Sequence, residues 1–195
     1  MDEIECLEGV PDLIGLQMAN QMPLGTFDFI HSVDSVKLAD KINSVADMIG
    51  SRPRILLEVN VSGEKSKSGM EPGEVEGAVR HITENCERIT LEGFMTMAPY
   101  SENPEDARPV FRKLRELRDN LERKLGLSLP RLSMGMSGDW EVAVEEGATW
   151  VRLGTILFGE RPKLKPVRAQ GDDDGSSLGG LDSYSGEGAT VKILD

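Results

Sequence analysis

Short apolar, β-prone runs alternate with longer amphipathic segments along most of this chain, and that alternation restricts its fold more than any other feature. Buried strands are expected at 27–33, 54–62, 89–97, 130–135 and 150–159, with a weaker one at 11–17. Between these runs apolar residues recur every three or four positions, which is the period of one helix face. Regular alternation of strand and helix indicates parallel strands joined by crossover helices.

The expected helices have residues that can begin and end them. Asp34 or Ser35 can cap the first helix by accepting a hydrogen bond from an amide of its first turn. Asn103 followed by Pro104 predicts the start of the third helix, and Gly126 predicts its end. A short helix is expected over 139–146. The apolar stripes of the three longer helices are Leu38, Ile42, Val45 and Ile49; Val75, Val79, Ile82 and Cys86; and Val110, Leu114, Leu117, Leu121 and Leu125.

Two architectures fit this pattern, an open doubly wound sheet and a (β/α) barrel. In a barrel the functional groups gather at the carboxyl ends of the strands. Residues unusual for a core fall at those ends here, namely Ser62, Lys65, Thr96, Met136, Ser137, Gly154 and Thr155. We therefore expect an α/β fold, a parallel TIM-type barrel over residues 1–165. Gly, Ser and Asp dominate residues 166–195, which predicts a disordered acidic tail.

Composition argues against several kinds of partner. The formal net charge is −12 at pH 7, so we expect no nucleic acid and no membrane surface as partner. Cys6 and Cys86, together with His31 and His81, match no metal-ligand spacing, and no metal site is expected. No run approaches the roughly 18 apolar residues of a membrane span, and the chain does not open like a signal peptide. These features predict a cytoplasmic protein.

Two segments could together bind an anion. Ser137 follows a strand and precedes a helix, whose first amides point toward the strand ends with partial positive charge. Ser137 is alternatively only the N-cap of that helix, with its hydroxyl closing on the amide of Trp140. On the next strand, Gly154 permits close backbone approach and Thr155 offers a hydroxyl. Neighbouring strand ends of this kind predict a convergent phosphate or carboxylate pocket.

Arg152 lies inside an otherwise apolar strand, two residues before Gly154. Side chains two apart on a strand share a face, so Arg152 is expected to face the same pocket. A buried arginine is rare without a partner. Its partner is either an inward carboxylate such as Glu58, or a ligand ring or anion.

Several segments in order resemble the pyridoxal phosphate homeostasis proteins, which are relatives of the N-terminal barrel domain of alanine racemase. The resemblance runs over residues 12–161 and is carried by "FDFIHSVDSVKLADKIN", "ILLEVNVSGEKSKSGMEPGE", "LEGFMTMAP" and "LSMGMSGDWEVAVEEGATWVRLGTILFGER". It implies a barrel that binds pyridoxal 5′-phosphate (PLP) and carries this cofactor rather than catalysing a reaction. By this resemblance Ser137, Gly154 and Thr155 hold the phosphate, Arg152 lies near the pyridine ring, and Met136 is placed with them.

The sequence also departs from the family pattern. The family's PLP lysine lies in a Val-Ser-Lys motif on the first strand, and a Gly-Glu-Asn motif follows on the second; neither is found here. The next block, "IGLQMANQ", has Gln21 where the family has lysine. No remaining lysine can be assigned the Schiff-base role, so we expect the first two βα units to be absent and PLP or phosphate to be held non-covalently.

Three interpretations stay open at this point. The chain is a PLP-binding homeostasis protein, a degenerate cofactor-free barrel fragment that acts through association, or, least favoured, a racemase-like enzyme. Two exposed sheet edges would favour self-association. A truncated product of a longer gene and a diverged paralogue both fit the missing motifs.

Overall fold

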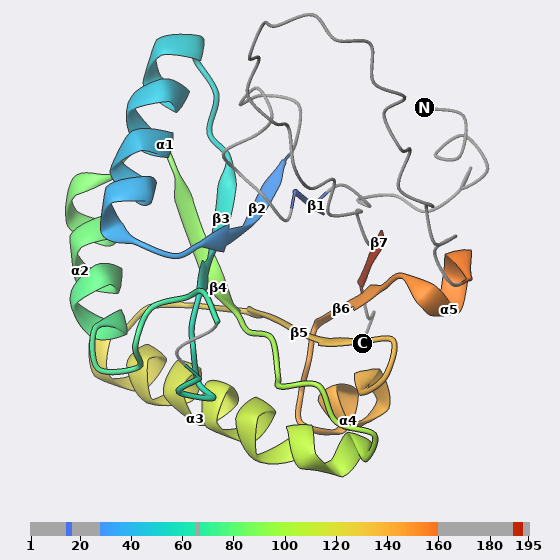
Figure 1. Ribbon diagram of the computed structural model, residues 1–195. Helices are drawn as coiled ribbons and strands as arrows, with labels where there is room; N and C mark the ends of the chain where they lie inside the picture. Colours follow the sequence, from blue (N-terminus) through green and yellow to red (C-terminus); the bar gives the residue numbers. More distant parts are fainter. Residues whose placement is uncertain (1–14, 17–27, 65–66, 160–188, 193–195) are drawn as a thin grey trace, which may run out of the picture.

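The computed structural model describes residues 15–16, 28–64, 67–159 and 189–192, which form one curved sheet flanked by helices (Figure 1). The sheet has seven strands in the spatial order β1-β2-β3-β4-β5-β6-β7. Strands β1 to β6 are parallel, and β7 pairs antiparallel with β6. The strands are β1 (Gly15–Leu16), β2 (Phe29–Val33), β3 (Arg54–Glu58), β4 (Thr90–Met95), β5 (Arg131–Met136), β6 (Trp150–Leu153) and β7 (Ala189–Lys192).

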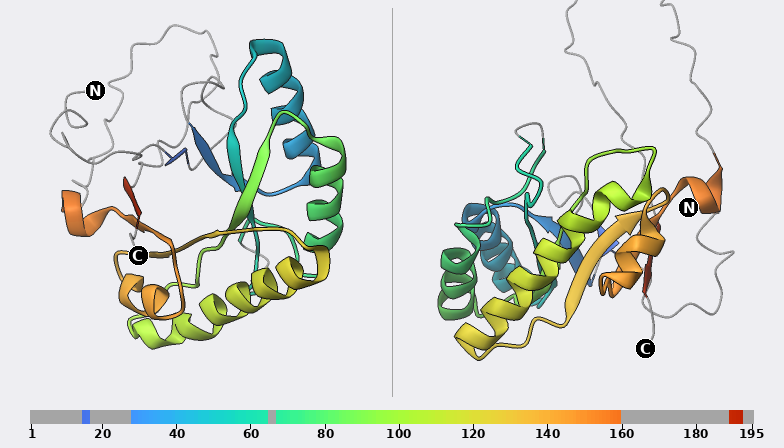
Figure 2. Two further views of the ribbon diagram at one scale, coloured as in Figure 1. Left: turned by 180° about the vertical axis from the view of Figure 1, so that it is seen from behind. Right: turned by 90° about the horizontal axis from the view of Figure 1, so that it is seen from below.

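The helices lie along the convex side of this sheet, which curls into a half-barrel (Figure 1, Figure 2). They are α1 (Val36–Ile49), α2 (Val75–Asn85), the 3₁₀ turn η2 (Pro104–Ala107), α3 (Arg108–Leu125), α4 (Trp140–Glu145) and α5 (Thr155–Phe158). The predicted incomplete (β/α) barrel is therefore confirmed. Within the described part of the chain, none of the helices combines the length and apolar character that crossing a bilayer requires.

The helix boundaries follow from local chemistry that the sequence makes visible. Ser35 caps α1, because its Oγ accepts a hydrogen bond from the Leu38 amide at 3.2 Å. Asn103 accepts from the amide of Glu105 and starts η2, which continues into α3. Gly126, with φ of 65°, ends α3 in the left-handed region that glycine adopts without a Cβ penalty.

Alternate residues of each strand face two different interiors. Ile55, Leu57, Phe94, Leu132 and Val151 point outward and pack with helix residues into the main hydrophobic core. On the concave side, Trp150 of β6 meets Phe29 of β2 edge-to-face with ring centroids 4.4 Å apart, and His31 lies 4.7 Å from the same indole. Because three strands separate β2 from β6 in the sheet, these rings fill the inside of the half-barrel.

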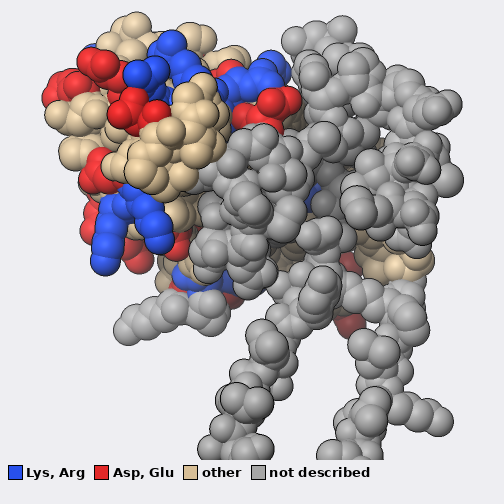
Figure 3. Space-filling view, turned by 90° about the horizontal axis from the view of Figure 1, so that it is seen from above, with Lys and Arg blue, Asp and Glu red and all other residues tan. Residues whose placement is uncertain are grey.

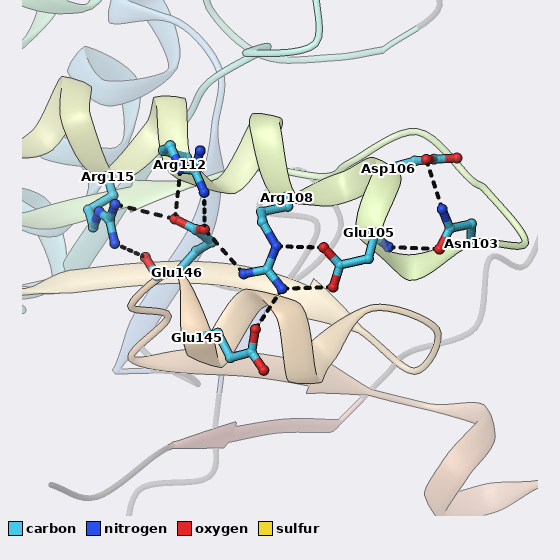
Figure 4. A network of polar contacts seen from close by, with 8 residues as sticks. All are labelled: Asn103, Glu105, Asp106, Arg108, Arg112, Arg115, Glu145 and Glu146. Atoms are coloured by element: carbon cyan, nitrogen blue, oxygen red, sulfur yellow. Dashed lines mark hydrogen bonds and ion pairs between the residues drawn. The ribbon is translucent and has the colours of Figure 1, made fainter.

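The close contact of α4 with β5 depends on Gly135. Its φ is +94°, and a Cβ added there would lie 2.6 Å from the Cβ of Ala143. At its other end, α4 is tied to α3 by charge. The buried carboxylate of Glu146 lies within ion-pair distance of Arg108, Arg112 and Arg115 (Figure 4). These contacts hold the β5–α4 turn, which carries Ser137, in a defined place.

The expectation of one strand over 150–159 was wrong. Strand β6 ends at Leu153, and residues Thr155–Phe158 form α5. The reason is that the amides of Gly154 and Ile156 donate to Ser137 Oγ instead of to a strand ladder. As a result Phe158 is 55% exposed rather than part of the core.

Four residues of the predicted disordered tail, Ala189–Lys192, instead form β7. They include β-prone Thr190 and Val191, and they pair with backbone groups of β6 that would otherwise lie at an open edge. Of the weak strand predicted at 11–17, Gly15–Leu16 is a strand, β1. The rest of that run, the other tail residues and Lys65 lie outside the described residues.

Candidate functional site

The turn after β5 and the turn after β6 meet at Ser137. Its Oγ accepts hydrogen bonds from the backbone N–H of Gly154 at 3.2 Å and of Ile156 at 3.4 Å. Thr155, between those two residues, is exposed to solvent, and Gly154 is half-buried. The predicted convergence of Ser137 with the Gly154–Thr155 segment is therefore present in the fold.

A hydroxyl group has two acceptor lone pairs and one donor proton. Ser137 uses its oxygen for two amides, which leaves its O–H free to donate. The amides of Gly154 and Ile156 are therefore engaged by Ser137 Oγ, and the Ser137 O–H is the donor that stays available at the ends of β5 and β6, of the kind that can bind an anionic oxygen.

Ser137 is not the N-cap of α4, so that alternative interpretation is wrong. Asp139 occupies the cap position, and its Oδ1 accepts from the Met136 amide at 2.6 Å. Because the Met136 amide already donates to Asp139, only the side chain of Met136 can contact a ligand here, and the residue is 38% exposed. Burial raises the pKa of the Asp139 carboxyl.

Arg152 lies on the concave face of the sheet, as its spacing predicts, and is 5% exposed. Its Nη1 donates to the backbone oxygen and to Oγ of Ser133, at 3.1 and 2.9 Å, and its Nη2 donates to the Thr96 carbonyl at 3.0 Å. Burial lowers its pKa to about 10, so the guanidinium stays charged at neutral pH.

The expected carboxylate partner of Arg152 is not in direct contact. Among the described residues no carboxylate oxygen lies within 4.0 Å of its guanidinium, and Glu58 acts on it only at longer range. Burial raises the pKa of the Glu58 carboxyl. Arg152 therefore links β4 to β5 through neutral acceptors and keeps its positive charge uncompensated at short range.

His31 and Ser133 extend this group, and sequence reasoning missed both. His31 Nδ1 lies 3.1 Å from Ser133 Oγ. Since Arg152 donates to the same oxygen, the Ser133 hydroxyl is left to donate to Nδ1, which assigns the imidazole proton to Nε2. Burial, aided by Arg152, lowers the pKa of His31 to about 3, so the ring is neutral. The period-two pattern of residues 29–31 and 131–133 would have placed both on the concave face.

Two buried donors of this group have no hydrogen-bond partner among the described residues: His31 Nε2 and Arg152 Nε. Unsatisfied buried donors are uncommon and call for a physical reason, such as a bound ligand or water. The interior of the half-barrel therefore offers unused donors as well as a charge.

Other residues that the sequence placed at the strand ends serve the fold instead. Thr96 donates its hydroxyl to the Val59 carbonyl at 2.7 Å and joins β4 to the end of β3. Ser62 donates to Asn60 and closes the turn after β3. A surface depression lined by Arg52, Cys86 and Leu129 lies away from these strand ends and is not part of the site.

Comparison with known proteins gives matches over most of the chain. Residues 12–162 match the model of the alanine racemase N-terminal domain. A pyridoxal phosphate homeostasis protein of Aquifex aeolicus is 51% identical over 138 residues, which cover 71% of this chain and 60% of that relative. Another, from Synechocystis, is 34% identical over 83% of this chain and 76% of the relative. The chain belongs to the pyridoxal phosphate homeostasis protein family.

Solved structures of the family have the same fold. PipY of Synechococcus elongatus, solved without PLP, is 32% identical and superposes with a TM-score of 0.70 over 81% of this chain and 76% of PipY. PipY solved with PLP bound is 34% identical, with a TM-score of 0.61 over 68% of this chain and 61% of PipY. The A. aeolicus match shows that the chain spans less than two thirds of some relatives.

Proposed function

We propose that this chain binds PLP non-covalently through its phosphate and takes part in cytoplasmic PLP homeostasis as a carrier rather than a catalyst. One observation carries the proposal: the N–H groups of Gly154 and Ile156 converge on Ser137, whose own O–H remains available as a donor. The PLP-bound relative PipY supports the choice of this anion over others.

The donor set fits the phosphate end of PLP. The Ser137 hydroxyl, with the exposed Thr155 hydroxyl beside it, would hold a phosphate oxygen, and the amides of Gly154 and Ile156 would join them by exchanging Ser137 Oγ for the phosphate. The buried charge of Arg152 would lie on the ring side, on the concave face of the sheet. When bound, PLP supplies an electrophilic aldehyde that condenses with amines.

Strands β2 to β6 offer no amine for that aldehyde, because they contain no lysine. The described lysines are Lys37 and Lys41 on α1, Lys113 and Lys124 on α3, Lys67 in the loop after β3, and Lys192 at the end of β7. Racemisation would also need a proton donor and acceptor near neutral pH. His31 does not serve that purpose, since burial holds its pKa at about 3. Both features support a carrier that holds PLP reversibly.

The proposal includes the partners. Positive and negative side chains are intermixed on the described face in Figure 3, without a basic patch, which supports the absence of a nucleic-acid partner. The terminal strands β1 and β7 end the sheet and would be the places where two copies associate. Light scattering over a range of protein concentrations tests this association.

Affinity for PLP in a Ser137→Ala variant tests the phosphate site. A hydrogen bond to a charged group contributes about 1.5–3 kcal/mol, so the dissociation constant should rise about 10- to 100-fold. Ser128→Ala is the matched control, because Ser128 is exposed in the loop before β5, away from the site. Equal PLP affinity in the two variants would exclude Ser137 from the phosphate site.

The cofactor-free fragment is the second candidate, and exposed α5 favours it. Ile156, Leu157 and Phe158 are 54%, 51% and 55% exposed, a surface suited to contact with another chain. This candidate predicts that inorganic phosphate and PLP leave the thermal stability of the protein unchanged, whereas the PLP carrier is stabilised by both.

A further inference from the structure

Three side chains with different metal-binding atoms meet on the outer surface of the half-barrel, away from the PLP site. Asp40 comes from α1, His81 from α2, and Cys86 from the residue that ends α2. Asp40 Oδ1 lies 2.8 Å from His81 Nε2 and 3.5 Å from Cys86 Sγ. All three donor atoms lie within 4.8 Å of one another.

The spacing is close to that of a tetrahedral metal site. Bonds of about 2.0–2.1 Å to nitrogen and oxygen and about 2.3 Å to sulfur place neighbouring tetrahedral ligands about 3.3–3.6 Å apart. The distance of 3.5 Å from Asp40 Oδ1 to Cys86 Sγ lies in this range, and that of 2.8 Å from Asp40 Oδ1 to His81 Nε2 is shorter. Small side-chain rotations would bring the ligand atoms to tetrahedral spacing. Asp40 and His81 are partly exposed, so their side chains can adjust and a water molecule can complete the shell.

The mixture of ligand atoms narrows the choice of metal. Thiolate, imidazole and carboxylate together are typical of Zn²⁺, whereas Mg²⁺ and Ca²⁺ prefer oxygen alone. The negative charge of the ligand side chains also favours a cation at this site. Asp40 is a carboxylate, Cys86 would bind as a thiolate, and neither makes an ion pair with lysine or arginine among the described residues.

Without a metal, the three side chains contribute little to the stability of the fold. The Asp40–His81 pair is a partly exposed contact of the kind that adds little stability. Cys86 Sγ donates to Asp40 Oδ1 at 3.5 Å, and a divalent cation would take the place of that thiol proton and bind both groups.

We propose that Asp40, His81 and Cys86 form a zinc-class metal site that joins α1 to α2, with water as the fourth ligand. The proposal is independent of PLP binding, because the site lies on the helices of the convex side. It differs from the expectation from sequence that the cysteines and histidines bind no metal, and a cobalt(II) titration decides between the two.

Cobalt(II) titration of untagged protein, freed of metal by a chelator, tests the site directly. Tetrahedral Co²⁺ bound to a thiolate has a charge-transfer band in the near ultraviolet and intense visible bands, which octahedral Co²⁺ on oxygen ligands lacks. The chain has two cysteines, so a Cys6→Ser background leaves Cys86 as its single thiol. We expect these bands at one cobalt per chain, and their loss on adding one equivalent of Zn²⁺.

Three further variants in this background assign the ligands. Cys86→Ser should abolish the charge-transfer band while retaining the hydrogen bond to Asp40. Asp40→Asn and His81→Gln change partly exposed side chains, so both variants should fold. Each should weaken Zn²⁺ binding more than about 100-fold, which exceeds the loss expected for a residue that only hydrogen-bonds to a ligand. Glu84→Gln, on α2, is the control and should leave the affinity unchanged.

Two results would overturn the proposal. One is a Co²⁺ spectrum without the thiolate band in the Cys6→Ser protein. The other is a zinc affinity in the Asp40→Asn and His81→Gln variants equal to that of the Glu84→Gln control. PLP absorbance in the same samples should not change with zinc, which separates this proposal from the proposed function.

Discussion

Replacing Arg152 by methionine should destabilise the fold, because the guanidinium joins β4 to β5 inside the half-barrel. The substitution keeps a long side chain but removes the donors to Ser133 and Thr96. The Ser133 carbonyl would keep a partner, since it also accepts from the Thr96 amide at 3.1 Å. The Thr96 carbonyl would lose the only donor that the described residues give it.

The magnitude follows from these losses. A buried carbonyl left without a donor costs about 1–3 kcal/mol. The substitution also removes the cost of burying a charge, and it removes the buried Nε that has no hydrogen-bond partner. These gains offset part of the loss, so we expect a net decrease of about 1–2 kcal/mol in the free energy of unfolding.

Urea unfolding followed by tryptophan fluorescence measures this difference, since Trp150 lies inside the same interior. Arg88→Met is the control: Arg88 forms an exposed ion pair with Asp47, and its loss should cost at most about 1 kcal/mol. Unfolding free energies of Arg152→Met and Arg88→Met that agree within error would refute a structural role for the buried guanidinium.

Three further perturbations test other parts of the structure. His31 has a folded pKa of about 3 against 6.5 unfolded, so the unfolded state binds more protons below pH 6.5. Stability should therefore fall by up to about 1.4 kcal/mol per pH unit as the pH drops from 6.5 to 5, and urea titrations should show a shallower slope in His31→Gln. Gly135→Ala should lower the unfolding free energy by at least about 2 kcal/mol because its Cβ would meet α4, whereas Gly138→Ala, with open space around it, should not; equal values would contradict that contact. Glu146→Gln should cost about 1–3 kcal/mol in thermal or urea unfolding because three arginines lose their buried partner, and exposed Glu145→Gln should cost under about 0.5 kcal/mol; the reverse order would contradict the network in Figure 4.

Local patterns were enough to predict most of the fold. Caps and stops such as Ser35 and Gly126 act over a few residues, so their effect can be read without the tertiary structure. The segment 150–159 failed for the opposite reason. Its apolar run has strand character throughout, but Ser137, 17 residues upstream of Gly154, withdraws two amides from the ladder and begins a helix there.

The candidate site was predicted in part for the same reason. Ser137, Gly154 and Arg152 stand out because their types are unusual in a core. The contacts of Arg152 come from Thr96 and Ser133, on two other strands, and no spacing along the chain indicates them. The Asp40–His81–Cys86 cluster was missed likewise, because Asp40 lies 41 residues from His81 and only the packing of α1 on α2 joins them.

The absorbance of PLP added to the purified protein, followed by borohydride reduction and peptide mapping, tests the central claim most directly. We expect weak, reversible binding that inorganic phosphate competes away, with borohydride fixing PLP to no single lysine. We also expect Ser137→Ala to lose this phosphate-sensitive binding. Stoichiometric labelling of one lysine would contradict the non-covalent carrier, and PLP binding that phosphate does not displace would contradict the phosphate site at Ser137 and Gly154.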